Sequence, residues 1–438
     1  MVNKMKGIEF NNISDITRPS GFSNKNVNKV NNLGWKNFTK NGLPPNPKTS
    51  ELWKYTNFHN LSKTNFFLPQ KESLDLKTNP EVFSSKKFQT IYIVDGFYNS
   101  EKSFHSDNIT VEKSNELSAL ETLSEKFGEI ASNDENEMIA LNSAFMLDPI
   151  FISIDDSKKE NNLNIVFVTT NNKNNISSFP RLFVQVNSKS QTNILESYFN
   201  LSSDKKNNLV VPVIEYLLEK GSNVSHKRMQ IDSGNSFFFQ FDRVLQKEES
   251  KFISTSFSLS GLVSRYDIHS DLVGINSECN FHGLYITNKN QLQENEISIT
   301  HSVEKCSSDQ MFKGILAGKS KAVFSGKVLV KQDAQKTRAF QKDLNFLLSK
   351  DCEVDTKPSL EIYADDVECS HGATAGNMDK NMLFYLQSRG INNEDAMSML
   401  IRGFAQEIID EFEDDEIIEY LENSIDNSIP SLDIQGIL

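Results

Sequence analysis

Short stretches in which apolar and polar residues alternate recur through the middle of the chain, and they constrain the fold more than any other feature. They lie between about residues 151 and 369 and include FISI, NIVFVTT, RLFVQV, FISTSFSLSG, NFHGLYIT, EISITHSV and KAVFSGKVLV. Polar turns separate them at roughly 8–12 residue intervals, the spacing typical of all-β proteins. The pattern predicts a mainly β core but leaves a β-sandwich and a parallel β-helix both open. No strict repeat is visible, which weakens the case for a solenoid on sequence grounds.

The regions on either side of this core are predicted to be different. Residues 1–150 are expected to form a mixed α/β, largely helical region, in which FQTIYIVDGFY is a strand candidate. Residues 151–370 are the expected β core, and residues 371–438 are an expected C-terminal helical domain. The sequence therefore predicts three parts, with the β core in the middle.

The C-terminal part has the pattern of a helical hairpin. LFYLQSRG ends in Gly390, which suits the position just after a helix, and the next helix opens with Glu394 and Asp395, which favour its positive end. An apolar stripe follows, of which part must face the β core and any surplus would suit a partner protein. The acidic end, IIDEFEDDEIIEYLENSID, is expected to be a solvated helix face or a frayed tail.

Composition argues against several classes of function. The 438 residues carry a net charge of −13, which disfavours nucleic acid and anionic membrane as main partners. No run approaches the roughly 20 apolar residues of a membrane span, and the N-terminus lacks the apolar segment of a secretory signal. The four cysteines are far apart and include no C-x-x-C pair: Cys279, Cys306, Cys352 and Cys369. They indicate neither a disulfide framework nor a zinc ribbon, so a reducing cytoplasm is the predicted location.

A glycine-rich stretch, GILAGKS at residues 314–320, is similar to a phosphate-binding loop but departs from that pattern. Its first glycine lies one residue too close to the second, and a strand-like segment follows it where the motif requires a helix. We therefore expect a turn between strands here and no bound nucleotide.

A cysteine and a histidine lie two residues apart late in the chain. Side chains at i and i+2 of a strand share one face, so Cys369 and His371 would point the same way. A thiolate with an imidazole suits iron or zinc, but two ligands do not complete a tetrahedral site. Asp365 and Asp366 are the only local candidates for a further ligand. The spacing by itself indicates half of a metal site.

These residues belong to a longer stretch that resembles a known family. AVFSGKVLV, AQKTRAFQKDLNFLLSKDCEVDTKPSLEIYADDVECSHGATAG and LFYLQSRGI closely resemble the SufB/SufD family of the Suf iron–sulfur cluster assembly machinery, and its SufD branch in particular. GLPPNPKTSELWKYTNF and ALNSAFMLD are similar as well, and the likeness is dense from about Phe312 to Glu407. SufB-type chains carry a HEAT-like stretch in place of CSHGATAG, which favours SufD.

The resemblance implies a right-handed parallel β-helix core, flanked by the N-terminal α/β region and the C-terminal helical domain. It implies a non-catalytic scaffold in a cytoplasmic SufB–SufC–SufD-type complex, in which ATP hydrolysis resides in the SufC-type ABC ATPase. The core would pair with the SufB-type paralogue, and the C-terminal hairpin would dock SufC, with Leu400, Ile401 and Phe404 as candidate contacts. A homodimer of the isolated chain and a flavin in the assembled complex stay open.

The resemblance also assigns roles to the Cys–His pair. The family's interface histidine corresponds to His371, and the cysteine two residues before it corresponds to Cys369. His371 would contact a nascent iron–sulfur cluster held transiently against SufB, and Cys369 would support it or be a packed thiol. Two alternatives are a self-contained Cys/His metalloenzyme and a carbohydrate-binding β-helix module. The second predicts exposed aromatic ladders, which the sequence does not show.

Overall fold

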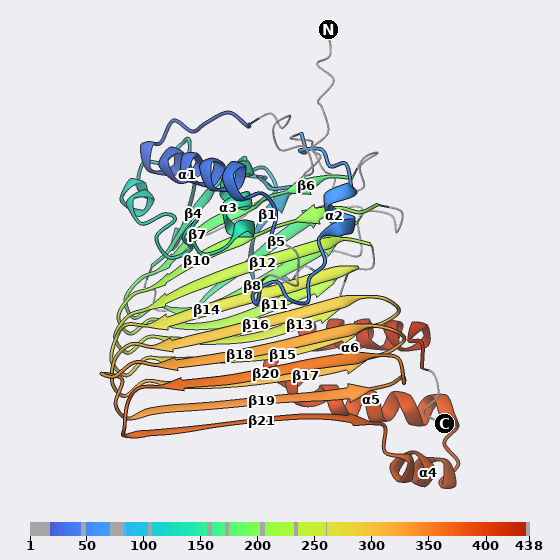
Figure 1. Cartoon of the computed structure of the whole chain (residues 1–438). Helices are drawn as coiled ribbons and strands as arrows, with labels where there is room; N and C mark the ends of the chain where they lie inside the picture. The colour runs from blue at the N-terminus through green and yellow to red at the C-terminus, as the bar shows by residue number, and fades with distance from the viewer. Residues whose placement is uncertain are drawn as a thin grey trace.

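Long strands stacked one above the other make up most of the molecule (Figure 1). The computed structural model describes residues 18–44, 50–70, 83, 85–103, 107–155, 160–170, 175–201, 206–231, 235–259 and 261–434. The strands form two sheets, and from β4 onward the chain passes from one sheet to the other as it descends the stack. Neighbouring strands within each sheet run parallel along most of its length, which is the arrangement of a parallel β-helix.

The two sheets take alternate strands of the chain. The first sheet contains β1 (Gln89–Val94), β5 (Asn161–Thr169), β8 (Gln191–Asn200), β11 (Asn223–Ile231), β13 (Lys251–Leu259), β15 (Glu278–Thr287), β17 (Ser307–Leu316), β19 (Thr337–Leu347) and β21 (Val367–Asn377). The second contains β4 (Ile150–Ile154), β7 (Arg181–Val186), β10 (Val213–Leu218), β12 (Phe237–Gln246), β14 (Val263–Leu272), β16 (Leu292–His301), β18 (Lys321–Val330) and β20 (Glu353–Ile362). The short strands β2 (Phe97–Tyr98) and β3 (Ile109–Lys113) pair antiparallel with β1 and β4, while β6 (Ser177–Ser178) and β9 (Leu209–Val210) pair with each other.

Equivalent positions on successive coils stack into columns. Val224 pairs with Phe252, Phe252 with Cys279, and Cys279 with Ser308. All four side chains are buried. The members of one column share a position but not a residue type, which explains why the coils leave no visible repeat in the sequence.

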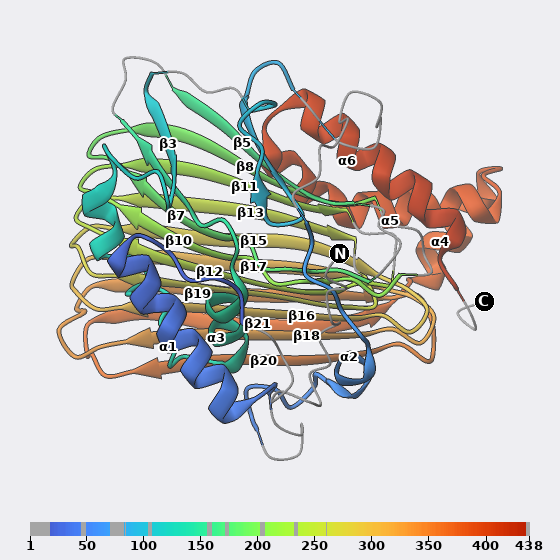
Figure 2. The ribbon, with the colours of Figure 1, turned by 90° about the horizontal axis from the view of Figure 1, so that it is seen from above.

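The N-terminal helices cover the upper part of the stack, as Figures 1 and 2 show. α1 (Lys25–Asn41) packs on α3 (Glu137–Phe145), and both begin at an asparagine whose side chain accepts hydrogen bonds from the first turn. A Cβ at Gly34 would lie 2.5 Å from Ser143 Cβ, so only glycine allows this approach. α2 (His59–Lys63) and the 3-10 helix η4 (Glu121–Glu125) complete this region.

Three C-terminal helices follow the β-helix, and the second and third of them lie on the outer face of the first sheet (Figure 2). They are α4 (Lys380–Ser388), α5 (Asn393–Ile409) and α6 (Asp415–Ser428), with short 3-10 helices η5 (Asp410–Phe412) and η6 (Ile429–Ser431). The acidic end, which we expected to be a solvated helix face or a frayed tail, forms the end of α5, all of η5 and most of α6. α6 packs on the rest of the chain because Ile417, Leu421 and Ile425, spaced four residues apart, are buried on one face.

The fold class predicted from the sequence is confirmed: a β-helix core lies between N-terminal and C-terminal helices. FQTIYIVDGFY forms the β1–β2 hairpin, and GILAGKS contains the turn between β17 and β18, where Gly318 has φ 63°. β21 continues past residue 370, where the sequence led us to end the core, because its pairing with β19 extends to Asn377. None of the described helices is long and apolar enough to cross a membrane.

Candidate functional site

The last coil of the β-helix, formed by β20 and β21, differs from the coils above it in what covers it. Within the described residues, β21 pairs with β19 on one side and β20 pairs with β18 on one side, so each is the last strand of its sheet. Most of β21 is exposed, whereas alternate residues of β16 in the middle of the stack are buried. The open strand edges and the uncovered inner face make this coil a surface that another chain can extend.

Cys369 and His371 both lie on the inner face of this coil. Cys369 is paired with Ala339 and His371 with Gln341, and both partners in β19 are buried. Cys369 packs against an apolar cluster that includes Val328, so its thiol is half-buried. His371 lies one inward position further along and is exposed. The structure therefore brings the two predicted residues onto one face and leaves the imidazole accessible.

The electrostatics of this face distinguish the two side chains. Burial raises the pKa of the Cys369 thiol, with a further contribution from Glu368, so the thiol is protonated at neutral pH. The cysteine is thus a weaker candidate ligand than the exposed His371. A protonated, half-buried thiol fits the two roles expected for Cys369, which are to support His371 or to pack in the core.

Polar side chains lie beneath the open coil. Burial raises the pKa of Asp343 to about 7, although a hydrogen bond from Asn345 opposes the shift. Asp343 Oδ1 and Gln341 Oε1 are buried without a hydrogen-bond partner in the described part of the chain. The lumen here is therefore polar and incompletely satisfied.

Cys369 and His371 do not build a metal site by themselves. Among the described residues, the one group of three or more His, Cys, Asp or Glu side chains close enough to share an ion is Glu196, His226 and Asp242, in another part of the molecule. Asp365 and Asp366 would be the further ligands of a single-chain metalloenzyme. They do not form such a group with the Cys–His pair. Within the described residues the pair therefore offers at most two ligand atoms at this place.

The three candidate partner contacts in α5 face the β-helix to different degrees. Ile401 is fully buried. Phe404 is half-buried, with its ring 5.3 Å from that of Phe346, and its carbonyl accepts a 3.0 Å hydrogen bond from Lys313 Nζ. Leu400 is half-buried in the same apolar cluster. These side chains hold α5 against the first sheet.

A different set of apolar side chains in the helical domain is exposed. It consists of Met382, Phe384, Tyr385 and Met399, with Phe384 70% exposed. α4, which carries the first three, lies at the lower end of the stack beyond the strands (Figure 1). The sequence analysis missed this patch, which we call the α4 patch, because an apolar stripe alone does not say which side of it packs inside the chain.

Comparison with known proteins shows which family has this architecture. Residues 19–164 match the family model of the SufBD protein N-terminal region, and residues 167–404 match the SufBD core domain of SUF system FeS cluster assembly. An iron–sulfur cluster assembly SufBD family protein of Synechocystis is 32% identical over 381 residues, which cover 83% of each chain. The chain belongs to the SufBD family. SufBD proteins are components of iron–sulfur cluster assembly, so the recognition made from the Cys369–His371 stretch is confirmed.

Two further relatives cover less of the chain. The iron–sulfur cluster assembly protein SufD of Escherichia coli is 37% identical over 209 residues, 48% of this chain and 49% of the relative. The chloroplastic protein ABCI7 of Arabidopsis thaliana is 31% identical over 249 residues, 57% of this chain and 52% of the relative. Both matches span about half of this SufBD chain.

Proposed function

We propose that this SufBD protein is a non-catalytic scaffold subunit whose terminal coil pairs with a SufB-type paralogue. The observation that supports this most is the exposure of β21 and of the inner face that carries Cys369 and His371. Every strand above β20 and β21 in the lower stack has a neighbour on both sides. A second β-helix could complete the last coil by adding strands to its edges. The same edges would pair two copies of the isolated chain when the paralogue is missing.

In this proposal His371 contacts the iron–sulfur cluster that the complex assembles. The cluster is the cargo, and its remaining ligands come from the SufB-type chain across the interface. An imidazole is a weaker ligand for iron in such a cluster than a thiolate, which suits a scaffold that must release its product. Cys369, as a protonated and half-buried thiol, supports the strand that presents His371.

The α4 patch is the proposed docking surface for a SufC-type ATPase. Its side chains are exposed and apolar and lie on the C-terminal helices, away from the terminal coil's inner face. Leu400, Ile401 and Phe404 contribute to docking indirectly, because their packing in the apolar cluster holds α5 in place beside the patch. ATP hydrolysis belongs to that partner, and a flavin in the assembled complex stays a prediction to which no residue is assigned.

The first test compares His371→Ala with His59→Ala in anaerobic co-expression with SufB-type and SufC-type partners. His59 is an exposed histidine of α2, near the opposite end of the stack (Figure 1). We expect His371→Ala to leave an intact complex with a reduced cluster absorbance in the visible spectrum, and His59→Ala to match the wild type. An intact His371→Ala complex with full cluster content would contradict the proposed role of the histidine.

The second test concerns the α4 patch. Phe384→Asp introduces one negative charge into the patch, and Lys380→Gln changes the net charge by the same amount at an exposed position on the same helix. We expect Phe384→Asp to weaken binding of the SufC-type partner by at least about tenfold, since a central aromatic contact contributes 1.4 kcal/mol or more. Lys380→Gln should bind as the wild type does. Equal binding by both variants would contradict the proposal that the α4 patch is the docking surface.

A further inference from the structure

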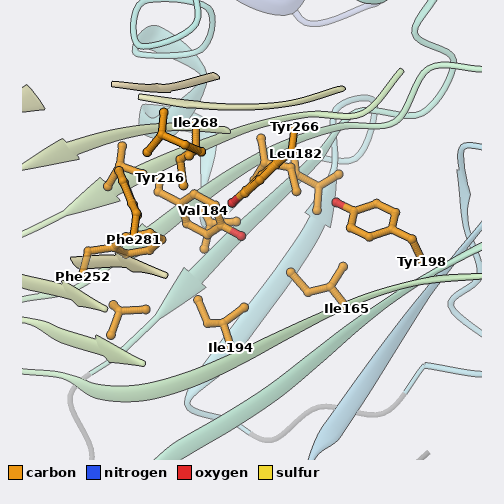
Figure 3. Close-up of a cluster of buried hydrophobic side chains, with 14 of the residues drawn as sticks. Ile165, Leu182, Val184, Ile194, Tyr198, Tyr216, Phe252, Tyr266, Ile268 and Phe281 are labelled. Atoms are coloured by element: carbon orange, nitrogen blue, oxygen red, sulfur yellow. The ribbon is translucent and has the colours of Figure 1, made fainter. Parts of the chain in front are cut away.

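A cluster of polar and ionisable side chains is buried inside the β-helix, well above the terminal coil. Glu196 of β8, His226 of β11 and Asp242 of β12 are fully buried, and their ligand atoms lie within 4.8 Å of one another. Figure 3 shows the surrounding lumen, in which Tyr198, Tyr216 and Tyr266 lie among apolar side chains such as Ile194 and Phe252. Burial of this many ionisable groups is costly unless a defined set of partners satisfies them.

Glu196 has such a set of partners. Its Oε2 accepts hydrogen bonds from Tyr198 Oη at 2.7 Å and from Gln240 Nε2 at 2.9 Å. Its Oε1 accepts one from Tyr216 Oη and lies 2.9 Å from His226 Nε2. Burial alone would raise the pKa of this carboxyl, but His226 and the tyrosine hydroxyls outweigh burial and lower it. Glu196 is therefore a buried carboxylate with both oxygens bonded.

The nearby cation does not neutralise the second carboxyl group. Arg228 donates to Gln240 Oε1 at 2.6 Å, to Ser258 Oγ at 2.9 Å and to Gln230 Oε1 at 3.0 Å. Its guanidinium also lies over the ring of Tyr266, 4.2 Å from the centroid. All three of these acceptors are neutral oxygens, and Arg228 makes no hydrogen bond to Asp242 in the described part of the chain.

Asp242 and Tyr266 are the two groups that the network leaves incomplete. Asp242 accepts from the single Gln240 Nε2, at 3.0 and 2.9 Å to its two oxygens. The Tyr266 hydroxyl lies near Asp242 and Ser254 but makes no hydrogen bond of normal geometry within the described part of the chain, although it is buried. In Figure 3 the hydroxyls of Tyr266 and Tyr216 point into the same part of the lumen. A carboxyl and a phenol thus face a shared space with few donors or acceptors.

We propose that Glu196, His226, Asp242 and Tyr266 form a buried site for one divalent first-row transition-metal ion. Carboxylate and imidazole ligands bind such ions at about 2.0–2.2 Å, and ligand atoms within 4.8 Å of one another can surround one centre. His226 Nδ1 lies 2.8 Å from Ser254 Oγ, a contact that fixes the ring and leaves Nε2 for the metal.

The site is separate from the surface proposed to bind the cluster. Its residues come from β8, β11, β12 and β14, whereas His371 lies on β21 at the far end of the stack (Figure 1). A small cavity of about 20 Å³, lined in part by Tyr198, Gln230 and Thr169, adjoins the network. The inference therefore does not depend on partner binding at the terminal coil.

The test uses the purified full chain, stripped of metal with a chelator and titrated anaerobically with Co²⁺. We expect one Co²⁺ per chain, with visible ligand-field bands of a nitrogen- and oxygen-ligated ion, and displacement of Co²⁺ by Zn²⁺. Asp242→Asn should weaken the affinity by at least about tenfold. Tyr266→Phe should alter the bands and weaken binding, and this variant removes one hydroxyl while keeping the ring that packs in the lumen.

Two control variants separate this site from other carboxylates and histidines. Asp343→Asn changes another buried lumen carboxyl, and His269→Gln changes a half-buried histidine that is bonded to Thr300. Both should bind Co²⁺ as the wild type does. The proposal is overturned if no ligand-field bands form, or if Tyr266→Phe binds with wild-type affinity and spectrum. Loss of the bands in His371→Ala would also overturn it, by placing the ion at the terminal coil. If Asp242→Asn does not fold, the Tyr266→Phe result decides.

Discussion

The middle coils and the last coil of this β-helix have the same backbone pairing but different surroundings. β16 in the middle pairs with β14 and β18, and its inward side chains such as Ile297 and Ile299 are fully buried. β21 pairs in register with β19 on one side, and its inward His371 is exposed. The difference shows that strand pairing in register does not by itself bury a coil. A coil buries both its edges and its inner face only where it has a neighbour on each side.

Near the open end of the lumen, Asp343 and Gln341 each keep a buried oxygen without a hydrogen-bond partner in the described residues. Unsatisfied polar atoms beneath an open coil fit a surface that a second chain completes.

The largest expected contrast between the regions is in cysteine reactivity. Cys369 of the last coil is half-buried, while Cys279, Cys306 and Cys352 are buried. A buried thiol reacts only when the structure opens, which for a stable core slows labelling by about a thousandfold or more. We expect native alkylation near pH 8, followed by mass spectrometry, to modify Cys369 alone, and Cys369→Ser to stay unmodified. Labelling of Cys279 at a similar rate would show that the middle coils open as readily as the last.

A pair of truncations compares the packing energies of the two regions. Phe252→Ala removes a fully buried ring that contacts Tyr216 and Phe281, and it should lower the free energy of unfolding by about 3–5 kcal/mol. Leu360→Ala in β20 removes a half-buried side chain, and the loss should be about 1 kcal/mol. Urea unfolding of the isolated chain measures both. Similar losses would mean that the last coil is packed as the middle ones are.

A histidine connects the middle coils to the C-terminal helices and makes that connection sensitive to pH. His282 of β15 lies 2.7 Å from both Asp309 and Glu411 of η5. Burial opposes its protonation, but these two carboxylates outweigh burial and raise its pKa to about 9. The stabilisation is fully present below the unfolded pKa of about 6.5 and is lost as the pH rises through 9, at most roughly 3 kcal/mol.

The melting temperature at pH 6.5 and at pH 9 tests this connection. We expect the wild type to lose stability between the two values, and His282→Gln to lose markedly less because it has no proton to release. His269→Gln, a change at a histidine away from the C-terminal helices, should keep the wild-type pH dependence. An equal loss in the wild type and His282→Gln would assign the pH dependence to other groups.

The smallest expected effect is at an ion pair on the last coil. Arg338 Nε lies 3.0 Å from Glu368 Oε2, and both side chains are more than 60% exposed. Because water screens such a pair, Arg338→Ala should change the free energy of unfolding of the isolated chain by less than about 0.5 kcal/mol. A larger loss in urea unfolding would indicate that this edge is held by its own surface contacts and does not need a partner.

The sequence by itself determined the local structure and the family. Alternating residues predicted the strands, Gly390 and Glu394 marked helix ends, and the stretch around Cys369 and His371 identified the SufBD family. Those features depend on neighbours along the chain, so they can be read without the fold. The β-helix itself followed from the family resemblance, because alternation does not say which strand pairs with which.

Only the tertiary structure decided which side chains meet across the coils. It brought Glu196, His226 and Asp242 together from three strands, although no spacing in the sequence relates them. It buried Ile401 and left Phe384 exposed, although both lie in apolar helical patterns. It buried one face of α6, including Leu421, within the acidic end of the chain. The reason is the same in each case: strand pairing and packing between distant segments decide these contacts, and one residue type can fill either side of a strand or helix.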